Sequence, residues 1–214
     1  MYLSRLTLNP RTRRVQRELA NPYELHRTLL RAFPEELPSG ERILFRLDTD
    51  ERTGIPTLLL QSHTRPDWAW LGDPGARDYL LQAPETKSFE LALVAGQRLA
   101  FRLRANPTAK HWREEGGESK AKRDPLMREE EQRAWLERKG EAGGFRLLHL
   151  NLSDEGTLRG RTAGDDRHAL HFRAVRFEGI LEVVDPECLW QTVQNGIGSG
   201  KSFGFGLLSL APAP

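Results

Sequence analysis

The residues best suited to chemistry on a phosphate are Tyr23 and His26, which could transfer protons, and Arg27, which could stabilise charge. They follow an Asn-Pro pair, which together with a glutamate in the first turn predicts a helix from Pro22 to about Phe33. Residues three or four apart share one flank of a helix, so a phenol, an imidazole and a guanidinium should lie near its N-terminus. The exposed backbone amides at such a terminus favour an anion such as phosphate.

These three side chains have the groups that cleavage of RNA without a metal ion requires. A base must take the proton of the 2′-hydroxyl, an acid must protonate the departing 5′-oxygen, and positive charge must stabilise the phosphorane. Histidine transfers protons near neutral pH, while Tyr23 could orient the ribose or share proton transfer and Arg27 could stabilise charge. The local pattern alone fits a structural His26, partly buried beside a core tyrosine, better than a catalytic one.

A glycine-rich segment near the C-terminus, residues 196–206, reads GIGSGKSFGFG. Gly200, Lys201 and Ser202 match the end of a nucleotide-binding P-loop, but position 195 is Asn where that motif needs its first glycine. The segment also follows a predicted helix instead of a strand, and only 12 residues remain after Ser202. We therefore reject an ATPase. Backbone without side chains could approach a phosphate, aided by Lys201, or could pack as a loop before the last strand.

The elements that position these residues follow the order strand, helix, strand, strand, helix, strand in the first half of the chain, and the second half repeats this order with one further strand before its second helix. The first half is predicted to have strands at 2–8, 43–47, 57–61 and about 88–94, an Arg-rich loop before the helix at 22–33, and a short helix near 66–71. The second half is predicted to have strands at 97–104, 145–152, 168–177, 179–184 and 205–210, helices at 126–141 and 186–195, and a mobile polar loop over 105–127.

This order predicts an α+β fold of two tandem ferredoxin-like (βαββαβ) domains. The first, residues 1–92, carries the histidine helix, and the second, residues 97–214, carries the glycine-rich segment. The two sheets would share their topology with the RNA-recognition scaffold, although the strands lack its stacking aromatic residues.

Composition limits the function classes. No apolar run is long enough for a membrane helix, and the N-terminus lacks a secretion signal. The single Cys188 excludes an internal disulfide and a multi-cysteine metal site. We therefore expect a cytoplasmic protein without a membrane partner. Arg makes up 26 of the 32 basic residues, which suits phosphate and guanine recognition, although an Arg-rich genome with solvated surfaces would give the same composition.

The glycine-rich segment also has a family pattern: Gly-hydrophobic-Gly, five residues that include a Lys, and a second Gly-hydrophobic-Gly. This arrangement is similar to the signature of the repeat-associated RNA-binding superfamily of CRISPR proteins. Within it, the chain resembles the CasE family in four separated segments: YLSRLTLNP at 2–10, NPYELHRTL at 21–29, RLRANP at 102–107 and FEGILEV at 177–183.

The resemblance implies a subtype I-E endoribonuclease that cuts precursor CRISPR RNA at the 3′ base of the repeat hairpin. Such proteins need no metal or other cofactor and leave a 5′-hydroxyl and a 2′,3′-cyclic phosphate or 3′-phosphate. They keep the mature crRNA as a subunit of the Cascade complex, so the partners would be the repeat hairpin and other Cascade subunits. The family's catalytic histidine and tyrosine fall on His26 and Tyr23.

The residues expected to contact RNA are Arg27 on the histidine helix, four glycines and a lysine of the glycine-rich segment, and three other basic residues. These are Gly196, Gly198, Lys201, Gly204 and Gly206 in the segment, with Arg159, Arg161 and Lys110 elsewhere. Arg167, near Arg161, and the basic residues Arg113, Lys120, Lys122 and Arg123, near Lys110, are further candidates. A solvated surface is the alternative for all the basic residues outside the two motifs.

Two other functions stay open at this point. Many members of the superfamily bind RNA without cutting it, and the Tyr-x-x-His pattern of Tyr23 and His26 favours the nuclease over such a subunit. A metal-dependent nuclease would need clustered carboxylates, whereas the acidic residues are scattered along the sequence.

Overall fold

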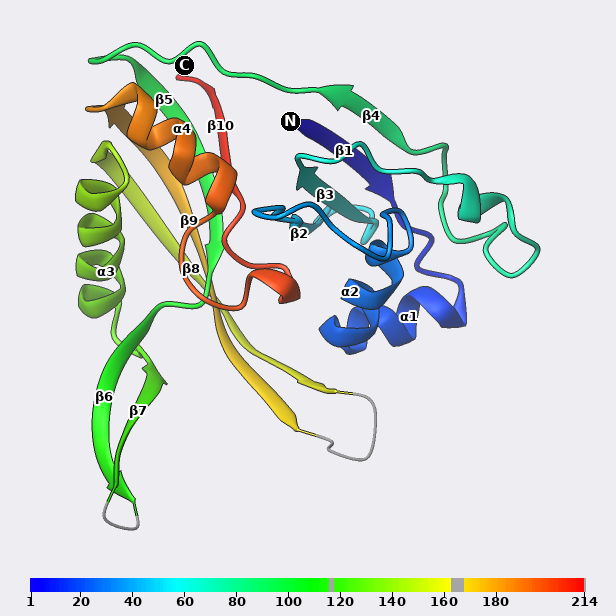
Figure 1. Cartoon of the computed structure of the whole chain (residues 1–214), viewed down its shortest axis with the longest axis horizontal. Coiled ribbons are helices and arrows are strands. Elements are labelled where there is room, and N and C mark those ends of the chain that lie inside the picture. Colours follow the sequence, from blue (N-terminus) through cyan, green and yellow to red (C-terminus); the bar gives the residue numbers. More distant parts are fainter. Residues whose placement is uncertain (116–117, 163–167, 214) are drawn as a thin grey trace. The chain divides into compact units, whose positions relative to one another are not determined.

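The structure of the protein is a computed structural model that describes residues 1–115, 118–162 and 168–213. The chain divides into two compact units (Figure 1). The first unit consists of Met1–Ala92, Arg159–His171 and Lys201–Leu207, and the second of Leu93–Leu158, Phe172–Gly200 and Leu208–Pro214. The domain limits predicted from sequence, 1–92 and 97–214, stay a prediction.

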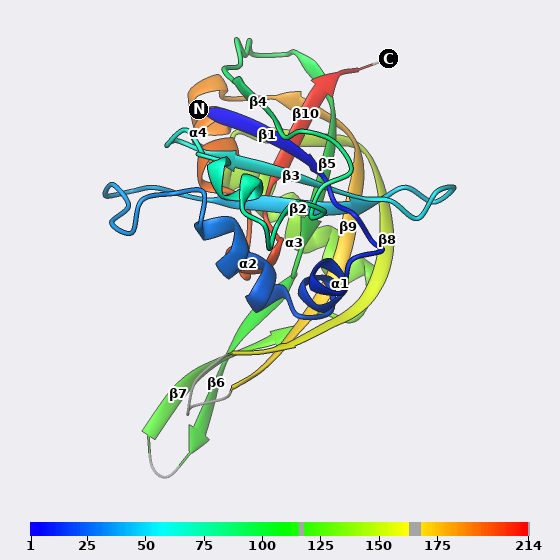
Figure 2. The same ribbon diagram turned by 90° about the vertical axis from the view of Figure 1, so that its right-hand side faces the viewer.

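The first unit has a four-stranded antiparallel sheet in the order β2-β3-β1-β4. Figure 2 shows β2, β3 and β1 side by side. The elements of its N-terminal part are β1 (Tyr2–Thr7), α1 (Arg13–Ala20), α2 (Pro22–Leu30), β2 (Leu44–Thr49), β3 (Pro56–Ser62), η1 (Ala69–Gly72) and β4 (Glu85–Ser88). Apolar residues from the strands and both helices form one core, including Leu6, Val15, Leu29, Phe45 and Leu58.

Helix α1 lies where the sequence predicted an Arg-rich loop, so that prediction was wrong. Its signal is present in the sequence: Thr12 caps the helix by accepting a hydrogen bond from the Val15 amide, and Val15 and Leu19 are one turn apart. Three arginines in the segment masked this short apolar stripe. Val15 is fully buried in the core, and Leu19 packs against it.

Other boundaries in this unit differ by a few residues from the predictions. Helix α2 ends at Leu30, but three successive hydrogen bonds between residues three apart continue the turns to Phe33. The predicted strand near 88–94 is β4, which is earlier in the chain and pairs with β1. The predicted short helix near 66–71 is the 3-10 helix η1.

The second unit has another four-stranded sheet, in the order β10-β5-β9-β8. Its elements are β5 (Arg98–Ala105), β6 (Thr108–Glu115), β7 (Glu118–Pro125), α3 (Glu129–Ala142), β8 (Phe145–Arg161), β9 (Ala169–Val183), α4 (Pro186–Asn195) and β10 (Leu208–Pro212). In both sheets the first strand lies between the last and the third, and the second strand is at an edge. The predicted α+β fold with two ferredoxin-like units is thereby confirmed.

Two predictions in the second unit were wrong. The segment predicted as a polar loop contains the antiparallel strands β6 and β7, which pair from Thr108↔Pro125 to Glu115↔Glu118. Two eight-residue strands separated by a Gly-Gly pair are a hairpin pattern, but their charged residues hid it. The strands predicted on either side of residue 178 are one strand, β9. Residue 179, within this strand, is a glycine because a Cβ atom there would be 2.0 Å from the carbonyl oxygen of His149.

No helix in the described part of the chain is long and apolar enough to cross a membrane.

Candidate functional site

Helix α2 begins as the sequence predicted. Asn21 is extended and its Oδ1 accepts a hydrogen bond from the amide of Tyr23 at 3.3 Å, with Pro22 in the first turn. Tyr23 is half-buried, whereas Arg27 is exposed. The guanidinium carbon of Arg27 lies 6.0 Å from the centre of the Tyr23 ring, and its Nη1 lies 3.7 Å from a carboxylate oxygen of Glu24.

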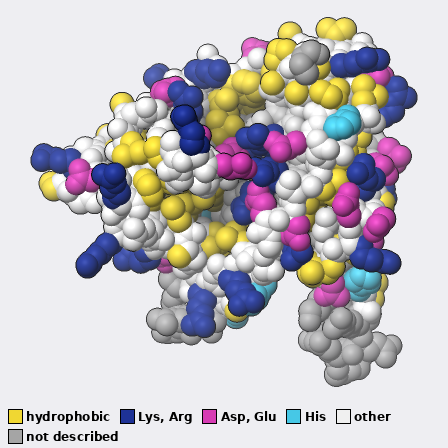
Figure 3. Space-filling model, turned by 180° about the vertical axis from the view of Figure 1, so that it is seen from behind, with side chains coloured by type: hydrophobic (Ala, Val, Ile, Leu, Met, Phe, Trp, Pro, Cys, Tyr) yellow, Lys and Arg dark blue, Asp and Glu magenta, His cyan; other side chains and the backbone are white. Residues whose placement is uncertain are grey.

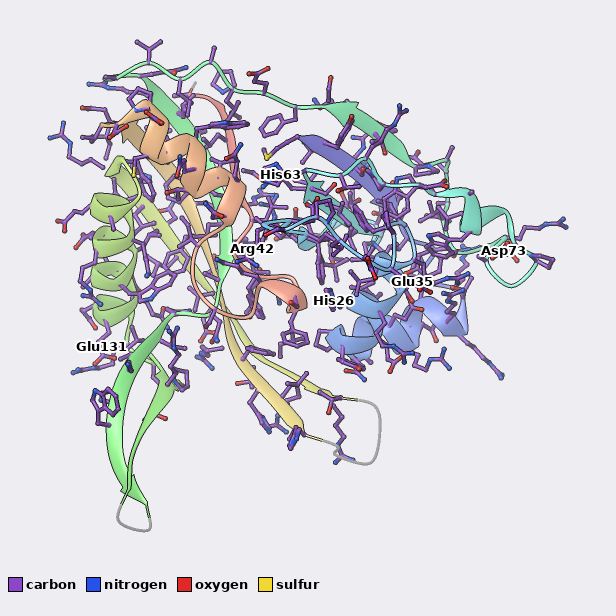
Figure 4. All side chains as sticks on the ribbon, viewed as in Figure 1. His26, Glu35, Arg42, His63, Asp73 and Glu131 are labelled. Carbon is purple, nitrogen blue, oxygen red and sulfur yellow. The ribbon has the colours of Figure 1, made fainter. Side chains whose placement is uncertain are left out.

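His26 is half-buried on the same helix, near two aromatic rings of the first unit. Its ring is stacked on Phe45 of β2, with 6.5 Å between centroids, and is tilted against Phe203 at 6.4 Å. Figure 4 labels His26 near the short helix η2, which contains Phe203. The Nδ1 atom is buried and has no hydrogen-bond partner among the described residues.

Burial lowers the pKa of His26 below the ordinary value of a histidine, because desolvation disfavours the charged imidazolium. The imidazole is therefore mostly neutral at neutral pH, which leaves it able to accept a proton. An unpaired buried nitrogen has a free-energy cost that a structural histidine would avoid by forming a hydrogen bond. The lowered pKa fits a base, and the unpaired Nδ1 distinguishes His26 from a histidine that is hydrogen-bonded within the core.

The C-terminal part of the glycine-rich segment belongs to the first unit. Lys201 begins η2 (Lys201–Phe203), which packs against α2 and β2. Gly204 and Gly206 have φ angles of 86° and 87°, a region that side chains with a Cβ rarely adopt. A Cβ at Gly204 would also lie 3.0 Å from the Phe45 ring. These glycines allow η2 to pack closely against the side of the first unit on which His26 lies.

The N-terminal part of the glycine-rich segment belongs to the second unit, and its glycines also have positive φ angles. Gly196, Gly198 and Gly200 have φ angles of 70°, 86° and 77°. A Cβ at Gly198 would lie 3.1 Å from the indole of Trp135. Close packing and backbone conformation thus explain these glycines structurally, and their contact with RNA stays a prediction.

The ends of β8 and β9 bring two more predicted residues into the first unit. Arg159 and Arg161 line a surface pocket of about 460 Å³ together with Asn21 and His171. The pocket therefore lies beside the N-terminus of α2, where an anion is favoured. Sequence reasoning missed His171, whose only signal was its position in the strand after the arginines. Arg167 lies outside the described residues.

Lys110 lies on β6 in the second unit. Its Nζ atom is 4.4 Å from the ring centre of Trp112, which is 64% exposed. Lys110 also pairs in register with Arg123 of β7, so the strand pair presents two cations and an aromatic ring. The side chains of Arg113, Lys120 and Lys122 lie outside the described part of the chain.

The charged side chains are mixed in sign on the face seen in Figure 3. Lys and Arg residues lie there among Asp and Glu residues instead of forming a patch of one sign. The strongest indication of an anion site in the first unit is thus local: the two arginines of the pocket beside the helix terminus.

Comparison with known proteins decides the family. Residues 1–212 match the model of a family described as CRISPR associated protein. The chain belongs to this family. It is 44% identical to the CRISPR-associated endoribonuclease Cse3 of Thermus thermophilus, over 99% of this chain and 100% of that protein. It is 34% identical to the CRISPR system Cascade subunit CasE of Escherichia coli, with the same coverage.

Solved structures support the relationship. One structure of the CRISPR endoribonuclease Cse3 bound to 19 nt RNA matches with a TM-score of 0.84 and 42% identity. The match covers 99% of this chain and 100% of the other. The resemblance inferred from the sequence is therefore confirmed along the whole chain.

In this CRISPR-associated protein the predicted site residues fall into two groups. The first unit holds Tyr23, His26, Arg27, Arg159, Arg161, Lys201, Gly204 and Gly206, and the second holds Lys110, Gly196 and Gly198. Within the first unit, the residues of α2, η2 and the end of β8 belong to one contact network through Asn21, His26 and Phe203.

Proposed function

We propose that this chain is a cytoplasmic endoribonuclease that cuts precursor CRISPR RNA at the base of the repeat hairpin. It retains the mature crRNA and acts as a subunit of Cascade. Full-length similarity to an endoribonuclease of CRISPR systems and to a Cascade subunit supports both parts of the proposal. The RNA bound to Cse3 in the similar solved structure supports RNA as the substrate.

The proposed reaction is an in-line transesterification without a metal ion. The 2′-hydroxyl loses its proton, its oxygen bonds to the adjacent phosphorus, and the bond from phosphorus to the 5′-oxygen breaks as that oxygen gains a proton. The products are a 2′,3′-cyclic phosphate and a 5′-hydroxyl. His26 would take the first proton, since its imidazole is mostly neutral. Tyr23 would orient the ribose or share proton transfer, and Arg27 would bind the phosphate.

The observation that carries this assignment is the state of His26. It is half-buried near Phe45 and Phe203, and its Nδ1 finds no hydrogen-bond partner among the residues described. A histidine that served only the core would lose free energy in this state.

The RNA would also contact basic residues outside α2. Arg159 and Arg161 lie at the pocket beside the N-terminus of α2 and could bind phosphates near the cut. Lys110 beside the exposed Trp112 could bind the stem, and Lys201 with the glycines at 196, 198, 204 and 206 could approach the backbone. The proposed domains, residues 1–92 and 97–214, would carry these surfaces.

The decisive experiment is incubation of the protein with its host's repeat RNA in EDTA, with both product ends mapped. We expect full activity, a 5′-hydroxyl on the downstream product and a cyclic phosphate or 3′-phosphate on the upstream one. His26→Ala should lower the cleavage rate by at least about 10²-fold and leave the affinity for the hairpin nearly unchanged.

His63→Ala is the matched control, because His63 is an exposed histidine of the same unit. Its cleavage rate should equal that of the wild type. Unchanged cleavage by His26→Ala would show that His26 has a structural role only. No cleavage by the wild type would favour an RNA-binding subunit that does not cut. A strict requirement for a divalent cation would refute the metal-free reaction.

A further inference from the structure

The side chain of Asn21 joins α2 to the end of β8. Its Oδ1 accepts a hydrogen bond from the backbone amide of Arg161 at 3.3 Å, and its Nδ2 donates one to the Arg161 carbonyl at 3.1 Å. The two residues are 140 positions apart in the chain, and both belong to the first unit.

This pairing uses the free edge of the strand. β8 is the edge strand of its sheet, and the next amide along the chain, that of Thr162, donates a hydrogen bond to the carbonyl of His168, the residue before the paired strand β9. Successive residues of a strand direct their amide and carbonyl groups to opposite sides, so those of Arg161 point away from β9. The side-chain amide of Asn21 binds them as the peptide group of a further strand would.

The same Oδ1 atom caps α2 by accepting from the Tyr23 amide. Asn21 therefore connects the helix that carries Tyr23 and His26 with the strand that carries Arg159 and Arg161. Each of these hydrogen bonds is between neutral groups and is weak by itself. Their combined effect is to fix the position of one element against the other.

Gly160 makes the close approach possible. A Cβ atom at this position would lie 2.8 Å from Asn21 Oδ1 and 2.9 Å from Pro22 Cδ. The φ angle of Gly160 is not positive, so the backbone itself does not require glycine there. The need for glycine comes from the contact with the start of α2.

We propose that Asn21 is a positioning residue for RNA cleavage. It holds the end of β8 at the N-terminus of α2, so that Arg159 and Arg161 meet the phosphate on which His26 acts. Both arginines line the pocket that Asn21 also lines. The catalytic consequence rests on the proposed function, whereas the contact itself does not.

Asn21→Ser separates this contact from helix capping. Ser caps a helix about as well as Asn, but it has no amide to bind the Arg161 carbonyl. We expect faster hydrogen exchange at the Arg161 amide, an unchanged circular dichroism spectrum, and a single-turnover cleavage rate lower by about 10- to 100-fold. The affinity for the repeat hairpin should change by less than about threefold, because the phosphate contacts that dominate affinity remain.

Gly160→Ala tests the same contact from the other side and should lower the cleavage rate similarly. The double variant should be little worse than either single one, because both changes break one interaction. Gly72→Ala is the matched control: Gly72 has no positive φ angle and open space around it, so its rate should equal the wild-type rate.

Equal exchange at Arg161 in the wild type and Asn21→Ser would overturn the contact. Faster exchange with a wild-type cleavage rate would overturn the positioning role, and so would a parallel loss of affinity and melting temperature. If the wild type itself left the RNA uncut while the exchange difference persisted, the proposed function would fail. The positioning role would fail with it, but the contact between Asn21 and β8 would stand.

Discussion

The imidazole of His26 contacts two aromatic rings and has one buried nitrogen without a hydrogen-bond partner among the described residues. Desolvation is the cause of its lowered pKa. At the scale of the single residue, the surroundings thus decide its protonation state before RNA binds. His63 of the same unit, by contrast, is exposed.

The lowered pKa of His26 predicts the pH dependence of cleavage. A base must be neutral, so kcat/KM should rise with pH below the ordinary histidine pKa of 6.5 and be level at neutral pH. The measurement is the cleavage rate at RNA and protein concentrations below saturation. Under these conditions the pH profile reports the ionisation of groups in the protein before RNA binds. His63→Ala should keep the same profile. A rate that falls as pH rises through this range would instead make His26 the acid.

At the scale of the elements, a buried carboxylate holds the helices of the first unit together. Glu18 of α1 is 3% exposed, and its oxygens accept hydrogen bonds from Thr28 of α2 at 2.8 Å and from Tyr79 at 2.5 Å. Arg14 donates a third, at 2.9 Å. Burial first, and then the charge of Glu18, raise the pKa of Tyr79 far above its usual range. The phenol therefore stays protonated and remains a donor at any pH used in assays.

Tyr79→Phe should lower the free energy of unfolding by about 1–3 kcal/mol, because it leaves a buried carboxylate oxygen without a donor. For a chain of this size the melting temperature should fall by about 2–4 °C for each kcal/mol. Thermal and urea unfolding both measure the effect. Tyr2→Phe is the control, since the described structure gives its hydroxyl no hydrogen bond. An equal loss in both variants would show that the Glu18 contact contributes nothing.

At the scale of the whole molecule, the chain repeats one sheet order in two units. Residues from distant parts of the sequence complete the first unit, since the ends of β8 and β9 and the segment 201–207 belong to it. The first unit is therefore not built from one continuous stretch of the chain. The predicted RNA-contacting residues are divided between the two units.

Retention of the product predicts a burst of about one product per protein, followed by a much slower phase set by release of the RNA. Because phosphate contacts release counterions, release should become faster as salt increases. The measurement is product formed with RNA in several-fold excess, at two salt concentrations. Adding the cleaved repeat hairpin to the protein before the substrate should lower the amplitude of the burst. Many rapid turnovers at low salt would contradict the role in Cascade.

Signals confined to one element made much of the fold predictable. Capping by Asn21 and Pro22 located the start of α2, and the helix predicted at 186–195 is α4. Alternation located β1 and β5. The predictions failed where the signal was hidden by charge, as in α1 and in β6 and β7, because surface strands and helices with many Arg or Lys side chains have little apolar periodicity.

The amino-acid sequence was enough to establish the α+β class, the helix that carries Tyr23 and His26, and, through its motifs, the family. These depend on interactions between residues a few positions apart, or on patterns that a whole family shares. What surrounds those residues depends on the folded chain. The buried state of His26 needs Phe45 and Phe203, the Glu18 network needs Tyr79, and the contact of Asn21 needs Arg161. Side chains so far apart in the sequence come together only on folding, because no local propensity encodes such a contact.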